Sequence, residues 1–250
     1  MEYTVAAVHE ALRVLMQVAH APGLGVTEIA RRSGNTKARA FRLLSTLEQA
    51  GFVQRGSAET DYVLGPMALA LGLAAQEQVS LARMGRKHLE ELGRRFNENV
   101  QIRVRDGLES VMVAKWDSSQ GVRVHSAVGA RRALHAGASG KLLLAFAPEA
   151  LREQVLEGPM QRFTPATLSQ RPRLAKDLAR VRAEGYAVSR GEVLDGVFAV
   201  AVPVLDARGE VIASLSLSLP QTRAPQDPAE MIDALTNSAQ ALSRELGWPG

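Results

Sequence analysis

Positions 31–42 have the residue types and spacing of a helix that binds nucleic acid. Five basic side chains and no acidic ones occur there: Arg31, Arg32, Lys37, Arg39 and Arg42. Arginine can donate two hydrogen bonds to the O6 and N7 atoms of guanine, and lysine binds phosphate. On an isolated helix the same charges could simply be solvated. The elements around this stretch must therefore decide between the two interpretations.

Residues 27–50 predict two short helices joined by a glycine turn. Thr27 has the position of an N-cap for the first of them, and Gly34 suits the tight turn that follows. Asn35 or Thr36 would cap the next helix, which is the third of the chain and runs to about residue 50.

A further helix precedes this pair and a hairpin follows it. The strand-like runs are Phe52–Gln54 and Asp61–Leu64. In the first helix an inward apolar face is predicted from residues three and four apart: Val5, Val8, Leu12, Leu15 and Ala19. This order of elements predicts a winged helix-turn-helix domain over residues 1–65, and it favours DNA binding over solvation.

The third helix separates into two faces at about 100° per residue. Its inward face is predicted to hold Ala40, Leu43, Leu44 and Leu47. A small residue, two arginines and an aromatic ring remain outside, which suits a major groove, while Lys37 and Arg55 are better placed for phosphate. The residues predicted to contact DNA are Thr27, Thr36, Lys37, Ala38, Arg39, Phe41, Arg42 and Arg55.

The remainder of the chain predicts a linker helix over 66–80 and an α+β domain over 81–250 with a mixed or antiparallel sheet. Expected strands lie at 100–105, 111–116, 122–128, 186–189, 197–205 and 211–219, and expected helices at 81–96, 139–147, 148–156 and 173–184, with a closing helix after 230. Alternation along the last strand puts Ser214, Ser216 and Ser218 on one face. Such hydroxyls could hold a small ligand, or lie on a solvated or helix-covered face.

At this point the sequence resembles the IclR family of bacterial transcriptional regulators. In the N-terminal part the resemblance lies in residues 26–30, 42–48, 51–53 and 62–65. In the C-terminal part it lies in Leu134-His135-Ala136 with Ser139-Gly140-Lys141, and in residues 163–167, 178–187, 196–203 and 209–211. The resemblance implies a GAF-like effector-binding domain and assembly as a dimer or a dimer of dimers.

The resemblance also implies which residues line the effector pocket: Val124, Ala138, Ser139, Ser189, Val197, Ala199, Ser216 and Ser218. Arg131, Arg132 and His135 lie close to that loop in sequence and could add positive charge or be solvated. One departure concerns DNA. Family members commonly have a Leu-Pro-Lys-Ser-Thr-like start to the recognition helix, whereas this chain has Asn35-Thr36-Lys37-Ala38-Arg39. We expect a different operator, with an added guanine or phosphate contact from Arg39.

Composition excludes several classes of protein. The chain has 250 residues, 46% of them hydrophobic, a net charge of +4 and no cysteine, so a packed core is expected without disulfides, thiolate chemistry or Cys-ligated zinc. The five histidines lack metal-ligand spacing, and neither a metal nor a cofactor is expected. No leader segment and no apolar run of about 18 residues is present, which favours a cytoplasmic protein without a membrane partner.

Two enzyme motifs fail around Ser139. A phosphate-binding loop would need Gly at the position of His135 and a hydroxyl at Leu142, and a nucleophile elbow would need Gly at Lys141. We therefore expect a regulator, not an enzyme, that binds double-stranded operator DNA and responds to a small organic or aromatic acid. Repression of a catabolic operon is expected first and activation second. Two further classes stay open, namely an enzyme with an accessory DNA-binding head and an architectural protein that responds to no effector.

Overall fold

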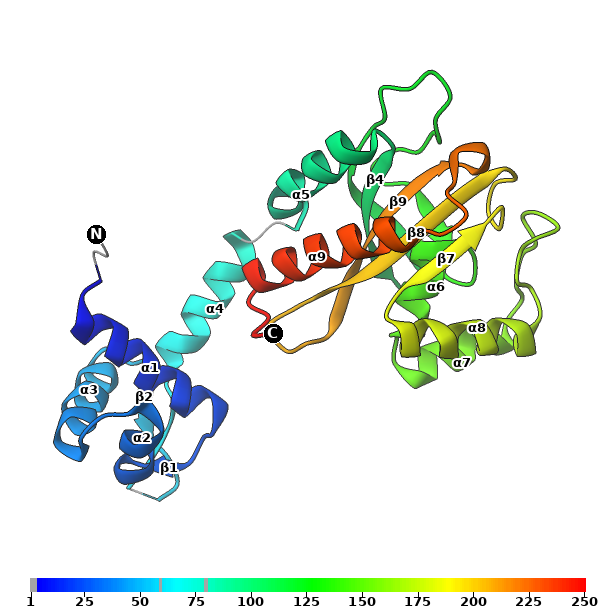
Figure 1. Cartoon of the computed structure of the whole chain (residues 1–250). Helices are drawn as coiled ribbons and strands as arrows, with labels where there is room; N and C mark the ends of the chain where they lie inside the picture. Colours follow the sequence, from blue (N-terminus) through cyan, green and yellow to red (C-terminus); the bar gives the residue numbers. More distant parts are fainter. Residues whose placement is uncertain (1–3, 59, 79–80) are drawn as a thin grey trace. The chain divides into compact units, whose positions relative to one another are not determined.

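The computed structural model describes residues 4–58, 60–78 and 81–250, and the chain divides into two units, Met1–Val79 and Ser80–Gly250. The predicted linker helix is α4, Pro66–Gln78 (Figure 1), and positions 79 and 80 of that prediction lie outside the described residues. In the described ranges, no helix is long and apolar enough to cross a bilayer.

The N-terminal unit is a helix-turn-helix with a small sheet. Its elements before α4 are α1 (Ala6–His20), β1 (Leu24–Gly25), α2 (Val26–Ser33), α3 (Lys37–Gln49), β2 (Val53–Arg55) and β3 (Asp61–Leu64). The three strands are antiparallel in the order β1-β3-β2, so the predicted hairpin forms and gains β1 as a third strand. Ile29, Leu44 and Tyr62 are buried together in the core of this unit.

The turn between α2 and α3 follows from its sequence. Gly34 has φ 70°, a left-handed conformation that favours glycine, and the Asn35 N–H donates to Ala30 O at 2.9 Å. The Thr36 hydroxyl accepts a hydrogen bond from the Arg39 N–H at 3.3 Å, so Thr36 is the N-cap of α3.

The prediction that Thr27 caps α2 is wrong. Gly25 pairs with Asp61 in the sheet, and α2 begins directly after it with Gly25 at the N-cap position and no side-chain cap bond. Thr27 therefore lies inside the first turn, exposed to solvent. The short β1 was not predicted, and its end determines where this helix starts.

The prediction for the inward face of α1 is also wrong. Val14 and Val18 pack into the core, whereas Val5, Val8 and Leu12 are 65%, 56% and 55% exposed. Ala19 is exposed as well, and Leu15 is partly buried. Nine residues separate Val5 from Val14, which puts them on opposite sides of the helix, about 180° apart. The helix has two apolar stripes, and the shorter one is covered by its own unit.

The C-terminal unit is a six-stranded sheet between two layers of helices. The strand order is β6-β5-β4-β9-β8-β7, and all neighbouring strands are antiparallel. The strands are β4 (Asn99–Asp106), β5 (Glu109–Trp116), β6 (Arg131–Ala133), β7 (Ala187–Arg190), β8 (Val197–Leu205) and β9 (Val211–Pro220). Helices α5 (Leu81–Phe96) and α9 (Ala229–Glu245) cover one face, and α6 (Ala138–Ala145), α7 (Glu149–Glu157) and α8 (Arg171–Glu184) lie on the other (Figure 1).

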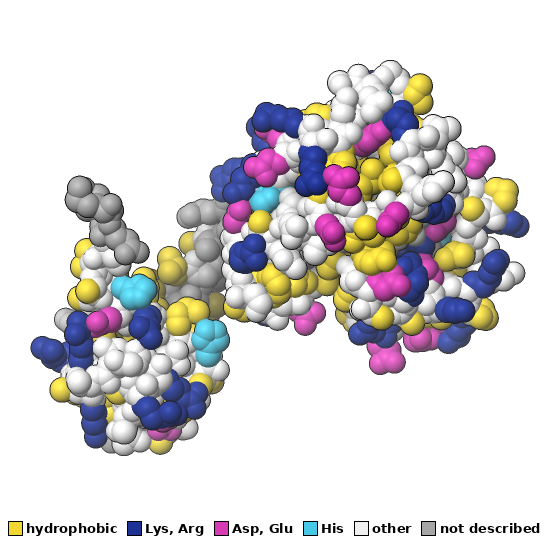
Figure 2. Space-filling view, viewed as in Figure 1, with side chains coloured by type: hydrophobic (Ala, Val, Ile, Leu, Met, Phe, Trp, Pro, Cys, Tyr) yellow, Lys and Arg dark blue, Asp and Glu magenta, His cyan; other side chains and the backbone are white. Residues whose placement is uncertain are grey.

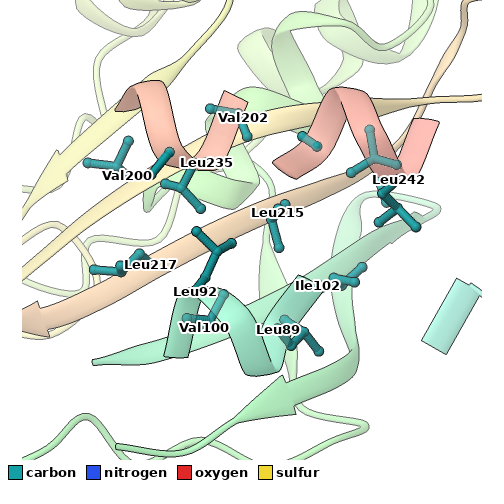
Figure 3. Close-up of a cluster of buried hydrophobic side chains, with 14 of the residues drawn as sticks. Leu89, Leu92, Val100, Ile102, Val200, Val202, Leu215, Leu217, Leu235 and Leu242 are labelled. Carbon is teal, nitrogen blue, oxygen red and sulfur yellow. The ribbon is translucent and has the colours of Figure 1, made fainter. Parts of the chain in front are cut away.

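Alternation along the strands divides their side chains between these two layers. Leu215 and Leu217 of β9 pack with Val200 and Val202 of β8 against Leu235 of α9 and its neighbours (Figure 3). The serines of β9 point to the opposite face, where α6 covers them. One face of the sheet is thus an apolar core, and the other carries polar groups beneath a helix.

The strand predicted over 122–128 does not form. This segment is a loop whose carbonyl groups are held by side chains from the sheet: Val124 O accepts from Asn99 Nδ2, and Ser126 O accepts from Lys115 Nζ at 2.8 Å. The strand beside β5 is instead β6, just after the loop. The alternating valines of this segment predict a strand. Their periodicity does not show that side chains from the sheet bind the backbone of the segment and hold it as a loop.

Candidate functional site

The exposed face of α3 carries most of the residues predicted to contact DNA. Ala40, Leu44 and Leu47 are buried and Leu43 is partly buried, as their spacing predicted. The predicted contact residues at the start of this helix are all exposed: Thr36, Lys37, Ala38, Arg39, Phe41 and Arg42. Thr27 on α2 and Arg55 at the end of β2 are exposed as well.

Several of these cations already contact glutamates. Arg31 and Arg32 both lie 2.6 Å from Glu28, and their hydrogen bonds lower the pKa of that carboxyl to about 2. Arg39 Nε lies 2.5 Å from Glu10 Oε2 of α1. The stretch of five basic residues contains no acid in sequence, but the fold brings acids to it from outside.

Arg55 lies at the edge of the same unit. Its Nε is 3.2 Å from Glu48 Oε1, and its guanidinium stacks 4.4 Å from the centre of the Tyr62 ring. Lys37 and Arg42 of α3 have no acidic partner in the described part of the chain. Figure 2 shows Lys and Arg side chains spread over this unit with few acidic groups among them. The surface can therefore bind a polyanion along α3.

A pocket that is partly open to solvent lies in the C-terminal unit. It is bounded by polar residues of the sheet, the start of α6 and the loop before β8. All the predicted effector residues except Ser216 line it, namely Val124, Ala138, Ser139, Ser189, Val197, Ala199 and Ser218. Ser216 is fully buried next to the pocket, and its hydroxyl accepts from the Ser139 hydroxyl at 2.9 Å.

The pairing of four strands explains why these residues meet. Asn99 of β4 pairs with Ser218 of β9, Ser218 pairs with Ala199 of β8, and Ala199 pairs with Ser189 of β7. Residues at paired positions point to the same face. The pairing thus forms a row of small and polar side chains across the pocket.

A buried ion cluster fixes one side of the pocket. Lys141 of α6 is 2% exposed, and its Nζ lies 2.5 Å from Glu192 Oε1 and 2.7 Å from Asp177 Oδ2. Burial would raise the pKa of Asp177, but hydrogen bonds and charge from Lys141 and Arg180 lower it. Glu192 also accepts from the Gly137 N–H at 3.1 Å. The pairing of these charges indicates a structural role for Lys141.

Sequence reasoning missed Arg103, which lines the pocket from β4. It is 2% exposed, its Nη2 donates to Ser110 O at 2.9 Å and to Ala130 O at 2.8 Å, and its Nη1 is buried without a partner among the described residues. Burial, and then the charge of Arg132, lower the pKa of Arg103 to about 10. Arginines alternate with apolar residues in this strand, and the alternation was consistent with a solvated face.

The three other basic residues considered near the loop have different environments. Arg132 lines the pocket, and burial lowers its pKa. Arg131 forms exposed ion pairs with Asp106 and Glu109. His135 is buried, stacks on Phe163 and bonds to Gln161 O at 2.8 Å. In the described ranges, no group of three or more acidic or histidine side chains is arranged to hold a metal ion.

Comparison with known proteins gives the family. The family model described as "Bacterial transcriptional regulator IclR C-terminal" matches residues 73–244. The chain belongs to the IclR family. The IclR helix-turn-helix model matches residues 7–57, so both units of an IclR regulator are present in order. This chain is a DNA-binding transcriptional regulator whose C-terminal unit is the effector-binding domain of the family.

Individual relatives agree with this assignment. The chain is 34% identical over 250 residues to the HTH-type transcriptional regulator XynR of Escherichia coli, covering 98% of each protein. A putative IclR regulator from a Silicibacter species has a similar structure, with a TM-score of 0.86, 28% identity and coverage of 98% of this chain and 97% of that one. An IclR homolog from Microbacterium hydrocarbonoxydans in complex with 4-hydroxybenzoate has a TM-score of 0.64 and 26% identity over 96% of this chain and 99% of that one. These relatives are regulators rather than enzymes.

Proposed function

We propose that this IclR regulator represses a catabolic operon by binding its operator duplex, and releases it when a small acid enters the pocket. The proposal rests on two features of the chain that occur together. The first is an exposed α3 on which Lys37 and Arg42 have no acidic partner among the described residues, and the second is a pocket in a separate unit that is lined by both polar and apolar residues. A bacterial operon lies in the cytoplasm, so we propose that location for the protein. A repressor named AllR in Escherichia coli, 31% identical over 209 residues, supports repression over activation.

In the proposed complex, α3 enters the major groove. Arg42 would contact a base, Ala38 would allow close approach, and Phe41 would contact a thymine methyl group. Lys37 and Arg55 would contact phosphate groups, and the hydroxyls of Thr27 and Thr36 would lie close to the sugar-phosphate backbone of the DNA. Arg39 would have to leave Glu10 to reach DNA, which costs little because the contact is partly solvated.

We propose that two copies bind one operator. Besides Val5, Val8 and Leu12, Met16 of α1 is 52% exposed, and these four residues form one stripe. Monomeric proteins rarely expose a contiguous apolar patch larger than a few hundred Å². In the same unit, Leu69 and Leu71 of α4 are also 67% and 59% exposed. The stripe fits a second copy of the chain, giving a dimer or a dimer of dimers. Light scattering of Leu12→Glu should then show a loss of oligomer, and of Arg13→Glu no change.

The effector is proposed to be a small organic or aromatic acid that occupies the pocket. The 4-hydroxybenzoate complex of the Microbacterium relative supports an acid. Because a ligand shifts an equilibrium only by binding two states unequally, it must favour the state with low DNA affinity.

Fluorescence anisotropy tests this function. A labelled duplex from upstream of the gene should bind at low salt, lose affinity steeply as salt rises, and be released by an acid from the neighbouring operon's pathway. Absence of salt-dependent binding to any upstream fragment would refute the DNA-binding proposal. Binding that no metabolite changes would refute the effector response, and stimulated transcription would favour an activator.

A further inference from the structure

Arg103 is a buried cation without an acidic partner among the residues that the structure describes. Its neighbours are the Ser110 hydroxyl and the carbonyl groups of Ser110 and Ala130, and within the same described ranges its Nη1 has no partner. Burial of an unpaired charge is costly, so an anion that enters the pocket would compensate it. The fold provides a binding group and leaves one of its donors free.

A second arginine adds positive charge to the same pocket. Arg132 lines the same pocket, and no ion pair of Arg132 occurs within the described ranges. The pocket contains two acids, and both are already paired: Asp117 with Lys115 at 2.8 Å, and Glu192 with Lys141 at 2.5 Å. The charge of the two arginines is therefore not cancelled inside the pocket.

Unpaired hydroxyls lie elsewhere in the pocket. Ser189 and Ser218 are 5% and 6% exposed, and in the described part of the chain neither hydroxyl has a hydrogen-bond partner. Asn99, which pairs with Ser218, is four residues from Arg103 along β4, or about 13 Å between Cα atoms. The charged groups and the hydroxyls thus belong to different ends of the site.

We propose that Arg103, supported by Arg132, binds the carboxylate of the effector, and that Ser189 and Ser218 bind hydroxyl or carbonyl oxygens at its other end. This rests on the proposed function, in which the pocket receives the effector. None of the eight pocket positions implied by the family resemblance carries a charge, so Arg103 supplies what they lack. A guanidinium binds a carboxylate in a planar geometry that an ammonium cannot reproduce.

Matched pairs of compounds test charge recognition on the full-length protein by calorimetry. The acids are gluconate, lactate and 4-hydroxybenzoate, and the neutral counterparts are glucitol, propane-1,2-diol and 4-hydroxybenzyl alcohol. At least one acid should bind at millimolar concentration or below and its counterpart should not. Which acid binds shows whether the pocket takes a polyhydroxylated, a short or an aromatic acid.

Three variants assign the charge to its residue. Arg103→Gln should weaken the acid about tenfold or more, and Arg103→Lys should recover only part of this loss. Arg131→Gln is the matched control, because this neighbouring arginine pairs with Asp106 and Glu109 outside the pocket lining. If Arg103→Gln fails to fold, Arg132→Gln should show a smaller loss of the same kind.

Three results would overturn the proposal: no acid binds, the neutral counterpart binds equally well, or Arg103→Gln and Arg132→Gln keep wild-type affinity. The proposed function fails separately. If a neutral metabolite releases the DNA while the acids are inert, the effector response is intact and the assignment to Arg103 is wrong. If acids bind through Arg103 but DNA binding never changes, the assignment to Arg103 is right and the proposed effector response is wrong.

Discussion

The two units use basic side chains in opposite ways. On the N-terminal unit Arg31, Arg32 and Arg39 lie at the surface, each beside a glutamate. In the C-terminal unit Lys141 is buried in an ion cluster, and Arg103 is buried with no acid beside it in the described ranges. A solvated contact is weak, so a surface arginine can exchange a glutamate for phosphate. Removing one member of a buried ion pair leaves the other charge buried and unpaired. The comparison therefore predicts that removing Lys141 costs much more stability than removing a surface arginine.

Breaking the buried cluster should have the largest effect. Lys141→Met keeps most of the side-chain volume but leaves the buried Glu192 without its cation and Asp177 with Arg180 alone, so it should lower the free energy of unfolding by about 3–5 kcal/mol. Chemical denaturation monitored by tryptophan fluorescence measures this, because Trp116 and Trp248 both belong to the C-terminal unit. Lys176→Met, an exposed lysine on α8, is the control, and equal stability of both variants would remove the contrast between the units.

Removing an exposed cation of α3 should affect binding and not folding. Arg42→Ala should weaken operator binding by about 1–3 kcal/mol, roughly fivefold to 150-fold, and relax the preference at one base pair. Lys37→Ala should weaken all duplexes alike and reduce the salt dependence by about one ion. Anisotropy titrations over a salt series separate these effects, with Arg173→Ala on α8 as the control. A lower melting temperature for Arg42→Ala would contradict its placement at the surface.

Two threonines of the helix-turn-helix sharpen the comparison within one unit. Thr36→Ala removes the N-cap of α3 and should lower the free energy of unfolding by about 1 kcal/mol. Thr27→Ala removes a hydroxyl without a cap bond and should change stability by less than about 0.5 kcal/mol. Thermal melts of the two variants test this, and an equal loss would mean that Thr27 caps α2 in solution.

The smallest effect is expected at Glu28, because its contacts with Arg31 and Arg32 are largely exposed. Hydrogen bonds to these arginines lower the pKa of Glu28 from 4.5 to about 2. The ionised carboxylate therefore stabilises the folded state above pH 4.5, and this stabilisation is lost as the pH falls toward 2. The free energy of unfolding of Glu28→Gln should thus be lower than that of the wild type at pH 5, and the two should be nearly equal at pH 2. Denaturation curves at both values check the sign, and a difference that grows toward low pH would contradict it.

Sequence reasoning succeeded where a periodic pattern determines the structure directly. The faces of α3 follow from residue spacing, and the serines of β9 share a face because strands alternate. It failed where more distant segments decide. The start of α2 depends on pairing between Gly25 and Asp61, and the buried face of α1 depends on which of two apolar stripes meets α2 and α3.

The pocket was predictable in part for the same reason. Ser139, Ser189 and Ser218, which the resemblance implies for the effector pocket, belong to elements that the pattern identifies, and they line this pocket. Their contact with an effector stays a prediction. Arg103 was missed because an arginine alternating with apolar residues is normally on a solvated face. Hydrogen bonds to Ser110 of β5 and to Ala130 O, which lies far along the chain, hold this arginine in the interior, and the local pattern does not show them.

The loop over 122–128 is fastened to the sheet through its own carbonyl oxygens, by amide and ammonium groups rising from β4 and β5. Every amino acid has the same carbonyl, so exchanges among the loop's side chains leave these attachments in place. Substitutions in this loop can therefore change the surface that it presents to a bound ligand while the sheet beneath it is unchanged. One fold can in this way come to recognise different ligands.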